Sequence, residues 1–427
     1  MLAGAASLLA SALAVTGLVD AGVRSEARGL KGNVTDAAGN PTRLTDPVPY
    51  TLSPNLSLAL DEPQRYTLRV AYASSLLFLA KAGSTEVYDT AYFGTASLLG
   101  AWQPSSRSRL DLTGTFSQGT QQITPAAQLT APDATSGGTQ QPAQLGMGNT
   151  PEQTPYHGES AALTGNIGIT RHYSLGGGLS FATGGATDKQ GKQFFPPQES
   201  WVVEAHAGAT PSPHDKLGLR AKYSRTNIYS FGIGDIVDAG LRWDRNLTSD
   251  VDSYLGAGVA ATVRSTLAGQ STGGGLAPTQ ERLTPVFEAG IAKRPPLERP
   301  GFGASLGVAY APYVDPYTVS VQKRGTVKAG MTWQPLARWR LTGELAGQAL
   351  IRDWRPRNGA GASELAVWYL QQRSDYGLAF RAGYTEVPRT DAVLATDGSL
   401  TRAAIPGTTF WEWSVSFVAR WGWRTEL

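Results

Sequence analysis

From Pro54 to the end of the chain, hydrophobic and polar residues alternate in stretches that are separated by turn-forming residues. In one such stretch, Tyr66 and Leu68 share one face, whereas Thr67 and Arg69 lie on the other. A period of two indicates a β-strand, because successive side chains of a strand point to opposite sides. The sequence therefore predicts a long series of amphipathic strands.

The connections between these stretches alternate in length. Short connections, such as 103–107 and 334–338, alternate with longer ones, such as 119–158 and 389–408. Short turns at one end and longer loops at the other are typical of an up-and-down membrane barrel. The predicted strands are 66–79, 89–103, 108–118, 160–171, 173–185, 199–210, 216–227, 235–247, 252–266, 281–293, 302–312, 318–334, 338–353, 362–373, 376–388 and 408–423.

The strand count depends on how the N-terminal part is interpreted. The segment 55–60 also alternates and would make a seventeenth strand. An even number then requires one more strand before it, for which 42–50 is the candidate despite its two prolines. We predict about sixteen strands, with eighteen as the alternative.

A soluble β-sandwich or β-propeller would also show alternation. A propeller has a repeat of about 40–50 residues with one motif per blade, and the sequence contains no such repeat. Aromatic residues instead recur on the apolar faces, as in the interfacial girdles of membrane barrels. The predicted fold is all-β, a transmembrane antiparallel up-and-down β-barrel. The predicted girdle residues are Tyr66, Tyr72, Trp243, Trp339, Trp411, Trp413, Trp421 and Trp423.

The N-terminus carries a run of apolar and small residues, 1–14, that ends in Ala12-Leu13-Ala14. Such a run with an A-x-A site is typical of a secretory signal peptide, although the basic residues that usually precede it are missing. A short buried helix is the other interpretation. We expect 1–27 to be a signal peptide or N-terminal apolar segment, 28–53 a flexible periplasmic segment, and 54–427 the barrel.

The composition of the chain excludes several classes of function. The chain has no Cys, which excludes disulfides and thiolate metal sites. No later stretch approaches 18 consecutive apolar residues, so ordinary transmembrane helices are not expected. With 37 basic and 34 acidic residues and no long run of one sign, the chain has no tail suited to nucleic acid.

Alternation also predicts which charged residues face the lumen. Basic residues outnumber acidic ones there, which favours a pore for anionic solutes. A network of paired charges that braces the wall is the structural alternative. A barrel of this size leaves an aqueous channel unless a loop such as 119–158 folds inside. The predicted lumen residues are Arg69, Asp111, Glu204, Arg220, Lys222, Asp238, Arg242, Arg264, Glu288, Lys328, Arg340, Glu344, Arg352, Arg381, Glu412 and Arg420.

Residues suited to catalysis are few. Of the four histidines, only His206 lies within a predicted strand on the inward face, close to Glu204. Such a pair more often lines a wall than binds metal or transfers protons. The sequence therefore predicts no catalytic residues, no metal site, no cofactor and no enzymatic activity.

The final strand, 410–423, places four tryptophans and a phenylalanine on one face. With the alternation and the girdle aromatics, it resembles the closing strand of bacterial outer-membrane β-barrels. That resemblance implies the outer membrane of a diderm bacterium, with lipid, lipopolysaccharide and the barrel-assembly machinery as partners. The chain departs from the usual terminal Phe, because it ends in Leu427.

The sequence leaves three functions open. The first is a pore for polar, anionic solutes. The second follows from a weaker similarity to exopolysaccharide-export barrels that work with periplasmic export machinery. The third is a structural or ligand-binding barrel without transport.

Overall fold

A computed structural model gives the fold of the chain. It describes residues 16–35, 41–45, 50–62, 65–80, 87–122, 153–188, 192, 197–229, 232–267, 283–294, 300–314, 321–352, 355–387, 393–394, 400–402 and 408–426. The apolar run 1–14 and most of the loop 119–158 lie outside these residues. No helix among the described residues is long and apolar enough to cross a membrane.

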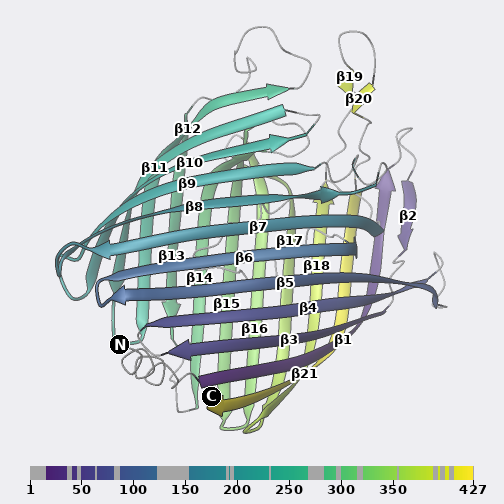
Figure 1. Cartoon of the computed structure of the whole chain (residues 1–427). Helices are drawn as coiled ribbons and strands as arrows, with labels where there is room; N and C mark the ends of the chain where they lie inside the picture. The colour runs from purple at the N-terminus through teal and green to yellow at the C-terminus, as the bar shows by residue number, and fades with distance from the viewer. Residues whose placement is uncertain are drawn as a thin grey trace, which may run out of the picture.

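In the described part of the chain, eighteen antiparallel strands pair in chain order and form a closed barrel (Figure 1). The barrel strands are β1 (Thr16–Thr35), β3 (Tyr50–Glu62), β4 (Tyr66–Ala80), β5 (Val87–Ser105), β6 (Ser108–Gln122), β7 (Gln153–Gly168), β8 (Tyr173–Ala186), β9 (Gln198–Ala209), β10 (Asp215–Ile228), β11 (Gly232–Asn246), β12 (Val251–Leu267), β13 (Leu283–Lys293), β14 (Gly301–Val314), β15 (Val321–Leu336), β16 (Trp339–Arg352), β17 (Arg355–Leu370), β18 (Ser374–Val387) and β21 (Thr408–Glu426). The short strands β2 (Pro41–Thr45), β19 (Val393–Leu394) and β20 (Leu400–Arg402) lie outside the ring.

The predicted barrel is confirmed, and the alternative count of eighteen is the correct one. All sixteen strands predicted from Tyr66 onward are present, and 55–60 belongs to β3. The strand that precedes β3 is β1, not the candidate 42–50; of that candidate, 42–45 belong to β2, which pairs with the end of β1. The observed strands begin earlier than the predicted boundary of the barrel at residue 54. β1 starts at Thr16, within the predicted segment 1–27, and the predicted segment 28–53 contains the end of β1, all of β2 and the start of β3.

The barrel closes between its first and last strands. β1 pairs with β21 from Thr16↔Glu426 to Val34↔Thr408, and with β3 from Thr16↔Asp61 to Ala27↔Tyr50. A closed sheet has no free edge, so the backbone groups along the seam are paired as they are elsewhere in the wall.

β1 escaped prediction because its outer face carries small residues. Ser25 lies opposite Phe417 and Gly29 opposite Trp413. A side chain at Gly29 would collide with the Trp413 ring, so the large rings of β21 cover the small residues of β1. At the seam the large apolar side chains belong to β21, and the sequence of β1 therefore shows only weak alternation.

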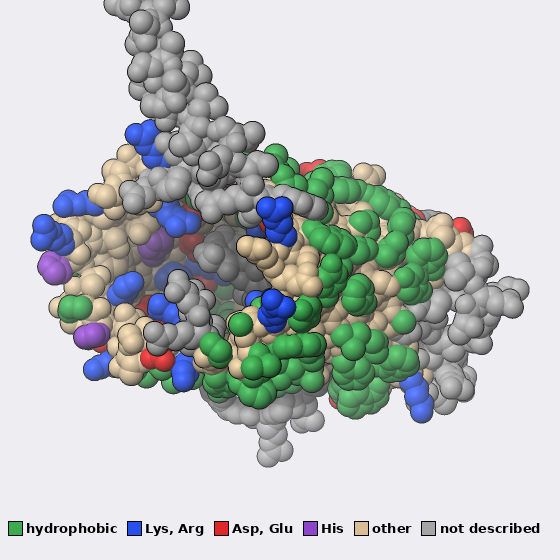
Figure 2. Space-filling view, turned by 90° about the horizontal axis from the view of Figure 1, so that it is seen from below, with side chains coloured by type: hydrophobic (Ala, Val, Ile, Leu, Met, Phe, Trp, Pro, Cys, Tyr) green, Lys and Arg blue, Asp and Glu red, His purple; other side chains and the backbone are tan. Residues whose placement is uncertain are grey.

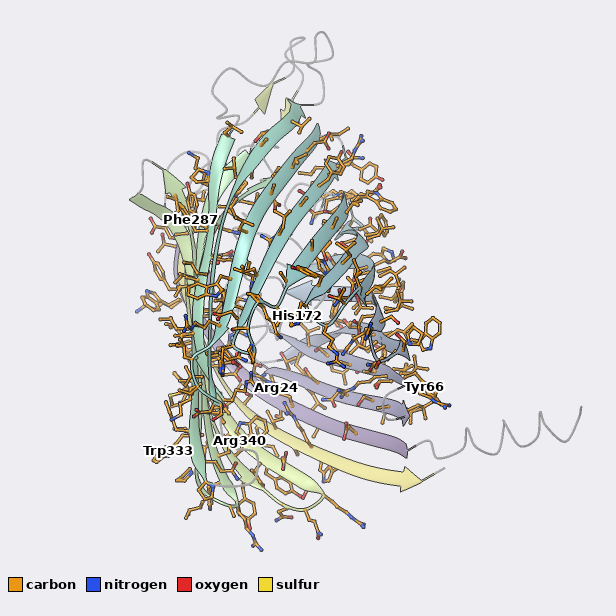
Figure 3. All side chains as sticks on the ribbon, turned by 90° about the vertical axis from the view of Figure 1, so that its left-hand side faces the viewer. Arg24, Tyr66, His172, Phe287, Trp333 and Arg340 are labelled. Carbon is orange, nitrogen blue, oxygen red and sulfur yellow. The ribbon has the colours of Figure 1, made fainter. Side chains whose placement is uncertain are left out.

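The outer surface of the barrel is apolar and has aromatic rings near both ends. Short turns connect β3 to β4, β5 to β6 and each later pair at one end of the barrel, which we call the short-turn rim; the other end is the loop rim. In Figure 3, Tyr66 and Trp333 lie on opposite outer flanks, whereas Arg24 and Arg340 lie between the walls. Exposed rings near the short-turn rim include Trp102, Tyr173, Trp243, Trp333 and Trp339, and those near the loop rim include Tyr50, Tyr92, Trp201, Tyr229 and Trp411.

Most of the predicted girdle residues lie on this outer surface. Tyr72, Trp243, Trp339, Trp411 and Trp413 are exposed there, and Tyr66 and Trp421 are half-buried on the same face. Tyr72 lies in the middle of β4, whereas the other exposed rings of the predicted set lie nearer the strand ends. The side chain of Trp423 lies outside the described residues.

Candidate pore lining

A connected group of charged side chains lies on the inner face of β10 to β13. Arg220 contacts Asp238 (Nε–Oδ1 3.9 Å) and Glu288 (Nη1–Oε1 3.9 Å). Lys222 also contacts Asp238 (Nζ–Oδ2 4.0 Å), and Arg242 contacts Glu288 (Nη1–Oε2 3.4 Å). We call these five residues the paired cluster, because each of its cations has a carboxylate within 4.0 Å.

Glycines on the strands between them allow Arg220 and Glu288 to meet. β11 and β12 separate the two residues, and Gly240 lies opposite Gly258 there. Gly256 lies opposite Glu288, and a Cβ at Gly256 would come within 2.6 Å of the Glu288 Cγ. These glycines have no side chains to fill the inner surface, so the long side chains of Arg220 and Glu288 extend over them and meet.

A second charged group crosses the seam where the barrel closes. Arg24 on β1 contacts Glu26 (Nε–Oε2 3.2 Å) and also Glu364 on β17 (Nη2–Oε2 3.5 Å). Arg381 on β18 contacts Glu412 on β21 (Nη2–Oε1 3.8 Å). These ion pairs connect side chains from β1, β17, β18 and β21, so they brace the seam from inside.

The same wall contains a buried tryptophan near the short-turn rim. Trp368 is only 7% exposed, and its Nε1 donates a hydrogen bond to the Thr342 Oγ1 (3.1 Å). The guanidinium carbon of Arg420 lies 4.8 Å from the ring centre, and that of Arg340 lies 5.8 Å away. Both distances are within the range of cation–π attraction. We call Arg340, Trp368 and Arg420 the tryptophan cluster.

Gly377 makes room for this ring. It is the cross-strand partner of Trp368, and a Cβ there would lie 2.7 Å from the ring. Among the described residues, the buried Nε of Arg340 has no hydrogen-bond partner. The two guanidinium groups are therefore held mainly by the ring rather than by close carboxylates.

Hydroxyl groups pair across the inner face of β5 to β7. The hydroxyls of Thr95 and Ser117 lie 3.0 Å apart, and those of Thr115 and Ser160 lie 2.6 Å apart. Viewed from below, Figure 2 shows charged side chains inside the hollow and hydrophobic side chains over the outer flank. The two faces of the same strands therefore differ sharply in polarity.

The structure places most of the predicted lumen residues on the inner face. That these residues line a conducting pore stays a prediction. The side chains of Arg264 and Arg352, on β12 and β16, lie outside the described residues. The inward residues are Arg69, Asp111, Glu204, Arg220, Lys222, Asp238, Arg242, Glu288, Lys328, Arg340, Glu344, Arg381, Glu412 and Arg420.

Sequence reasoning missed the inward residues of β1 and β17. Asp20, Glu26 and Glu364 add three carboxylates, whereas Arg24 adds one guanidinium. Asp20 contacts Arg69 (Oδ2–Nη2 3.7 Å), so it neutralises a charge that alternation alone left without a partner. The expected surplus of basic residues in the lumen is therefore smaller than the sequence predicted.

His206 lies on the inner wall opposite Arg220 and Gly176, and a side chain at Gly176 would collide with its ring. The tract 176–178 thus makes room for side chains of β9 at this point. Among the described residues, no three His, Asp or Glu side chains gather as ligands of a metal ion.

Comparisons by sequence found no matching protein-family model and no matching curated protein. Comparisons by structure found other barrels. The toluene transporter TodX from P. putida is 14% identical, with a TM-score of 0.37, covering 95% of this chain and 89% of that one. The siderophore receptor PirA from Acinetobacter baumannii is 8% identical, with a TM-score of 0.44, covering 94% and 80%. The ferric-catecholate import receptor Fiu from E. coli K12 is 10% identical, with a TM-score of 0.40, covering 94% and 81%.

These neighbours are transporters and receptors by their descriptions. With identities this low and TM-scores below 0.5, they carry no argument about what this chain binds. The functional argument rests on the strands themselves.

Proposed function

We propose that this chain is an outer-membrane barrel that lets polar solutes cross along its charged interior, with a preference for anions. The observation that carries the proposal is the contrast between the two faces of the wall. Exposed leucines, valines and aromatic rings cover the outside, and ion pairs and hydroxyl groups cover the inside.

A lipid bilayer accounts for the outer face. In hydrocarbon, every backbone donor and acceptor needs a partner within the protein, and a closed barrel supplies one for each strand. A charge on the lipid face at mid-membrane costs about 2–4 kcal/mol. Outward charges such as Glu199, Asp215 and Arg245 lie near strand ends, where that cost falls to about 0–1 kcal/mol.

The tryptophan cluster supports the preference for anions. In the paired cluster, carboxylates offset the cations, so it attracts neither sign strongly. Arg340 and Arg420 instead lie against Trp368, and Asp375, the cross-strand partner of Arg420, offsets only part of their charge. Guanidinium groups on a pore wall favour anions. The barrel acts without catalysis in this proposal.

The test is conductance of the purified protein in a planar bilayer. We expect discrete steps, and in a potassium chloride gradient a reversal potential that indicates chloride as the more permeant ion. Steps with potassium as the more permeant ion would overturn the anion preference but retain the pore.

The same experiment addresses the other two functions. A barrel that conducts only after a periplasmic partner is added would favour polysaccharide export with that machinery. No conductance under any condition would favour a structural or ligand-binding barrel and would overturn the pore.

A further inference from the structure

The short-turn rim has a repeating backbone contact. In most short turns, the residue just before the next strand accepts a hydrogen bond from the neighbouring hairpin. Gln103 donates to the Arg65 carbonyl (2.7 Å), Gly168 to Arg107 (2.6 Å), Thr210 to His172 (2.8 Å), Asn246 to His214 (2.8 Å), Arg294 to Asp250 (2.7 Å), Leu370 to Arg338 (2.8 Å) and Gly422 to Arg373 (3.0 Å). These bonds fix one equivalent residue in each of these seven hairpins on the rim.

The residues at this position are mostly cationic. Arg338, Arg373, Arg65 and Arg107 occupy four consecutive short turns around the closed ring, across the seam. Asp250, in a more distant turn, is the one carboxylate at this position among the described residues. The Thr248 hydroxyl donates to Asp250 (2.7 Å) and holds the pKa of that carboxyl below its ordinary value.

Arg338 indicates where such a side chain can reach. Its Nη1 lies 3.5 Å from the hydroxyl of Tyr369, whose ring packs against Trp339 at 5.2 Å between centres. Trp339 is exposed on the outer surface. At this turn the guanidinium group therefore meets the aromatic girdle, on the lipid side of the rim.

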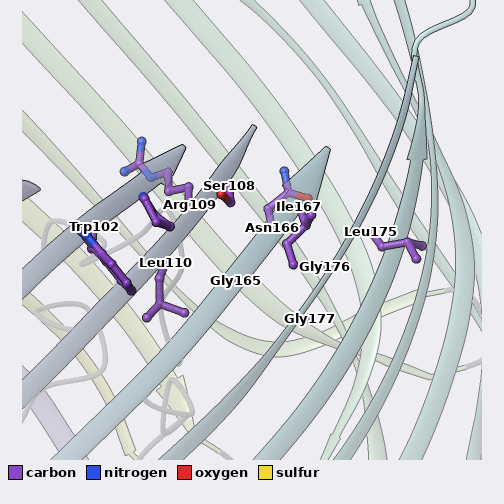
Figure 4. A pocket seen from close by; sticks show the side chains of 11 residues that line it. Trp102, Ser108, Arg109, Leu110, Gly165, Asn166, Ile167, Leu175, Gly176 and Gly177 are labelled. Carbon is purple, nitrogen blue, oxygen red and sulfur yellow. The ribbon is translucent and has the colours of Figure 1, made fainter. Parts of the chain in front are cut away.

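A groove of about 460 Å³ lies on the outer surface close to this arc (Figure 4). Its walls include Trp102 and Ile167, which are 55% and 61% exposed, together with Leu110 and Leu175. Gly165 and Gly177 lie at its floor, where the absence of side chains hollows the surface. The volume is within the range of ligand-binding clefts, about 300–1,000 Å³.

Arg107 lies next to this groove at the rim. Gly168, which donates to its carbonyl, follows Ile167 of the groove wall. Ser108 and Arg109, which directly follow Arg107, also line the groove. An apolar channel that ends beside a cation matches a molecule with a hydrocarbon chain and an anionic head.

We propose that this groove and the adjoining arginines, Arg65 and Arg107, bind an anionic phospholipid of the leaflet that surrounds the short-turn rim. An acyl chain occupies the groove, and the phosphate of the headgroup contacts the guanidinium groups. The proposal rests on the proposed function only in that it requires a barrel inserted in a bilayer; it does not require conduction.

The position of Arg65 and Arg107 along the barrel axis fits contact with lipid phosphates. The headgroup layer extends about 5–7 Å beyond each side of a hydrocarbon core about 30 Å thick. Along a strand tilted by about 40°, two residues advance about 5 Å along the barrel axis. Arg65 directly precedes the girdle residue Tyr66, so its backbone lies at the edge of the core and its side chain can reach the phosphates.

The test measures lipid binding by native mass spectrometry after delipidation, with phosphatidylglycerol and phosphatidylcholine titrated separately. We expect the wild type to bind one phosphatidylglycerol about tenfold more tightly than phosphatidylcholine, since each arginine near an anionic surface contributes substantially. The double variant R65Q/R107Q should lose that preference and still bind phosphatidylcholine. G165L should weaken the binding of both lipids, because a side chain there fills the groove.

Matched controls separate these effects from misfolding. Gly114 also faces outward and has room for a side chain, so G114L should bind lipid like the wild type. K31Q/K323Q removes two outward cations near the loop rim and should also leave binding unchanged. Slower migration of each variant after heating, compared with the unheated sample, would show that its barrel has folded.

Equal affinity of the wild type for both lipids, or unchanged binding by both R65Q/R107Q and G165L, would overturn the lipid site. If instead a soluble acidic polypeptide bound through Arg65 and Arg107 and the lipids did not, the rim would be a protein-docking surface and the lipid proposal would be wrong. Conductance of the same variants keeps the two proposals apart: lost conductance with retained lipid binding would contradict only the pore.

Discussion

The paired cluster and the tryptophan cluster hold their arginines on the same inner surface with different sets of partners. Both include a ring contact, since the Arg242 guanidinium carbon lies 4.2 Å from the Tyr254 ring centre, but the paired cluster adds close carboxylates. In the paired cluster, Glu288 lies between Arg220 and Arg242, within 3.9 Å and 3.4 Å of their guanidinium nitrogens. In the tryptophan cluster, Arg340 and Arg420 lie against an aromatic ring, and their charges are less fully offset.

The contrast shows how one barrel wall can use the same residue for two purposes. A carboxylate fixes a guanidinium group and cancels its charge, whereas a ring fixes the group and preserves its charge. Glycines serve both arrangements, since Gly256 makes room for Glu288 and Gly377 makes room for Trp368. We therefore expect the first cluster to stabilise the wall and the second to influence what passes through it.

The largest expected effect comes from displacing the ring. In G377L, the new side chain would occupy the position of Trp368, so we expect the free energy of unfolding to fall by about 2–3 kcal/mol. The urea concentration at which the folded band disappears from an unheated gel measures the loss.

The matched control is G361L on the neighbouring strand. A Cβ at Gly361 meets only the carbonyl oxygen of Ala346, at 3.7 Å, so this variant should unfold close to the wild-type concentration. Equal loss in both variants would mean that the contact between ring and glycine is not the cause.

A smaller effect is expected from removing the shared carboxylate of the paired cluster. E288Q leaves Arg220 and Arg242 without one of their partners, so stability should fall by about 1 kcal/mol. Asp238 and Asp244 still lie beside Arg220 and Arg242, but the loss of one negative charge should raise chloride permeability relative to potassium, measured as a shift in reversal potential. An unchanged reversal potential would contradict the view that Glu288 cancels their charge.

The smallest effect on stability is expected in the tryptophan cluster. R340Q/R420Q removes two charges held mainly by a ring, so we expect the chloride-to-potassium permeability ratio to fall about threefold with little change in unfolding. R220Q/R242Q should instead destabilise the barrel, because Glu288 would lose both partners. Similar destabilisation of both double variants would erase the distinction between the clusters.

The sequence was sufficient to predict the strands wherever a strand carries its own large hydrophobic residues. β10, with Leu217 and Leu219 facing outward and Arg220 and Lys222 facing inward, is one example. β1 could not be identified in this way, because the rings that cover its outer face belong to β21. Its interior charges, Asp20, Arg24 and Glu26, were missed with it.

The tryptophan cluster was only partly predictable. Alternation assigned Arg340 and Arg420 to the lumen, but it could not orient β17, where Val367 and Trp368 are adjacent and both hydrophobic. The predicted strands 362–373 and 376–388 also placed the turn too late; the observed turn is 371–373, and this register makes Trp368 the partner of Gly377. A large ring opposite a glycine in a hairpin indicates that the ring lies flat over it.

The pairing of β1 with β21 has a consequence for how the molecule is made. Thr16 meets Glu426, so a contact needed to finish the wall joins residues from nearly opposite ends of the polypeptide. Contacts between residues so distant in sequence form slowly. Until the last strand arrives, β1 and β18 each present an unpaired edge. A growing chain of this protein therefore depends on protection of those two edges during its transit, up to the moment its final segment is delivered.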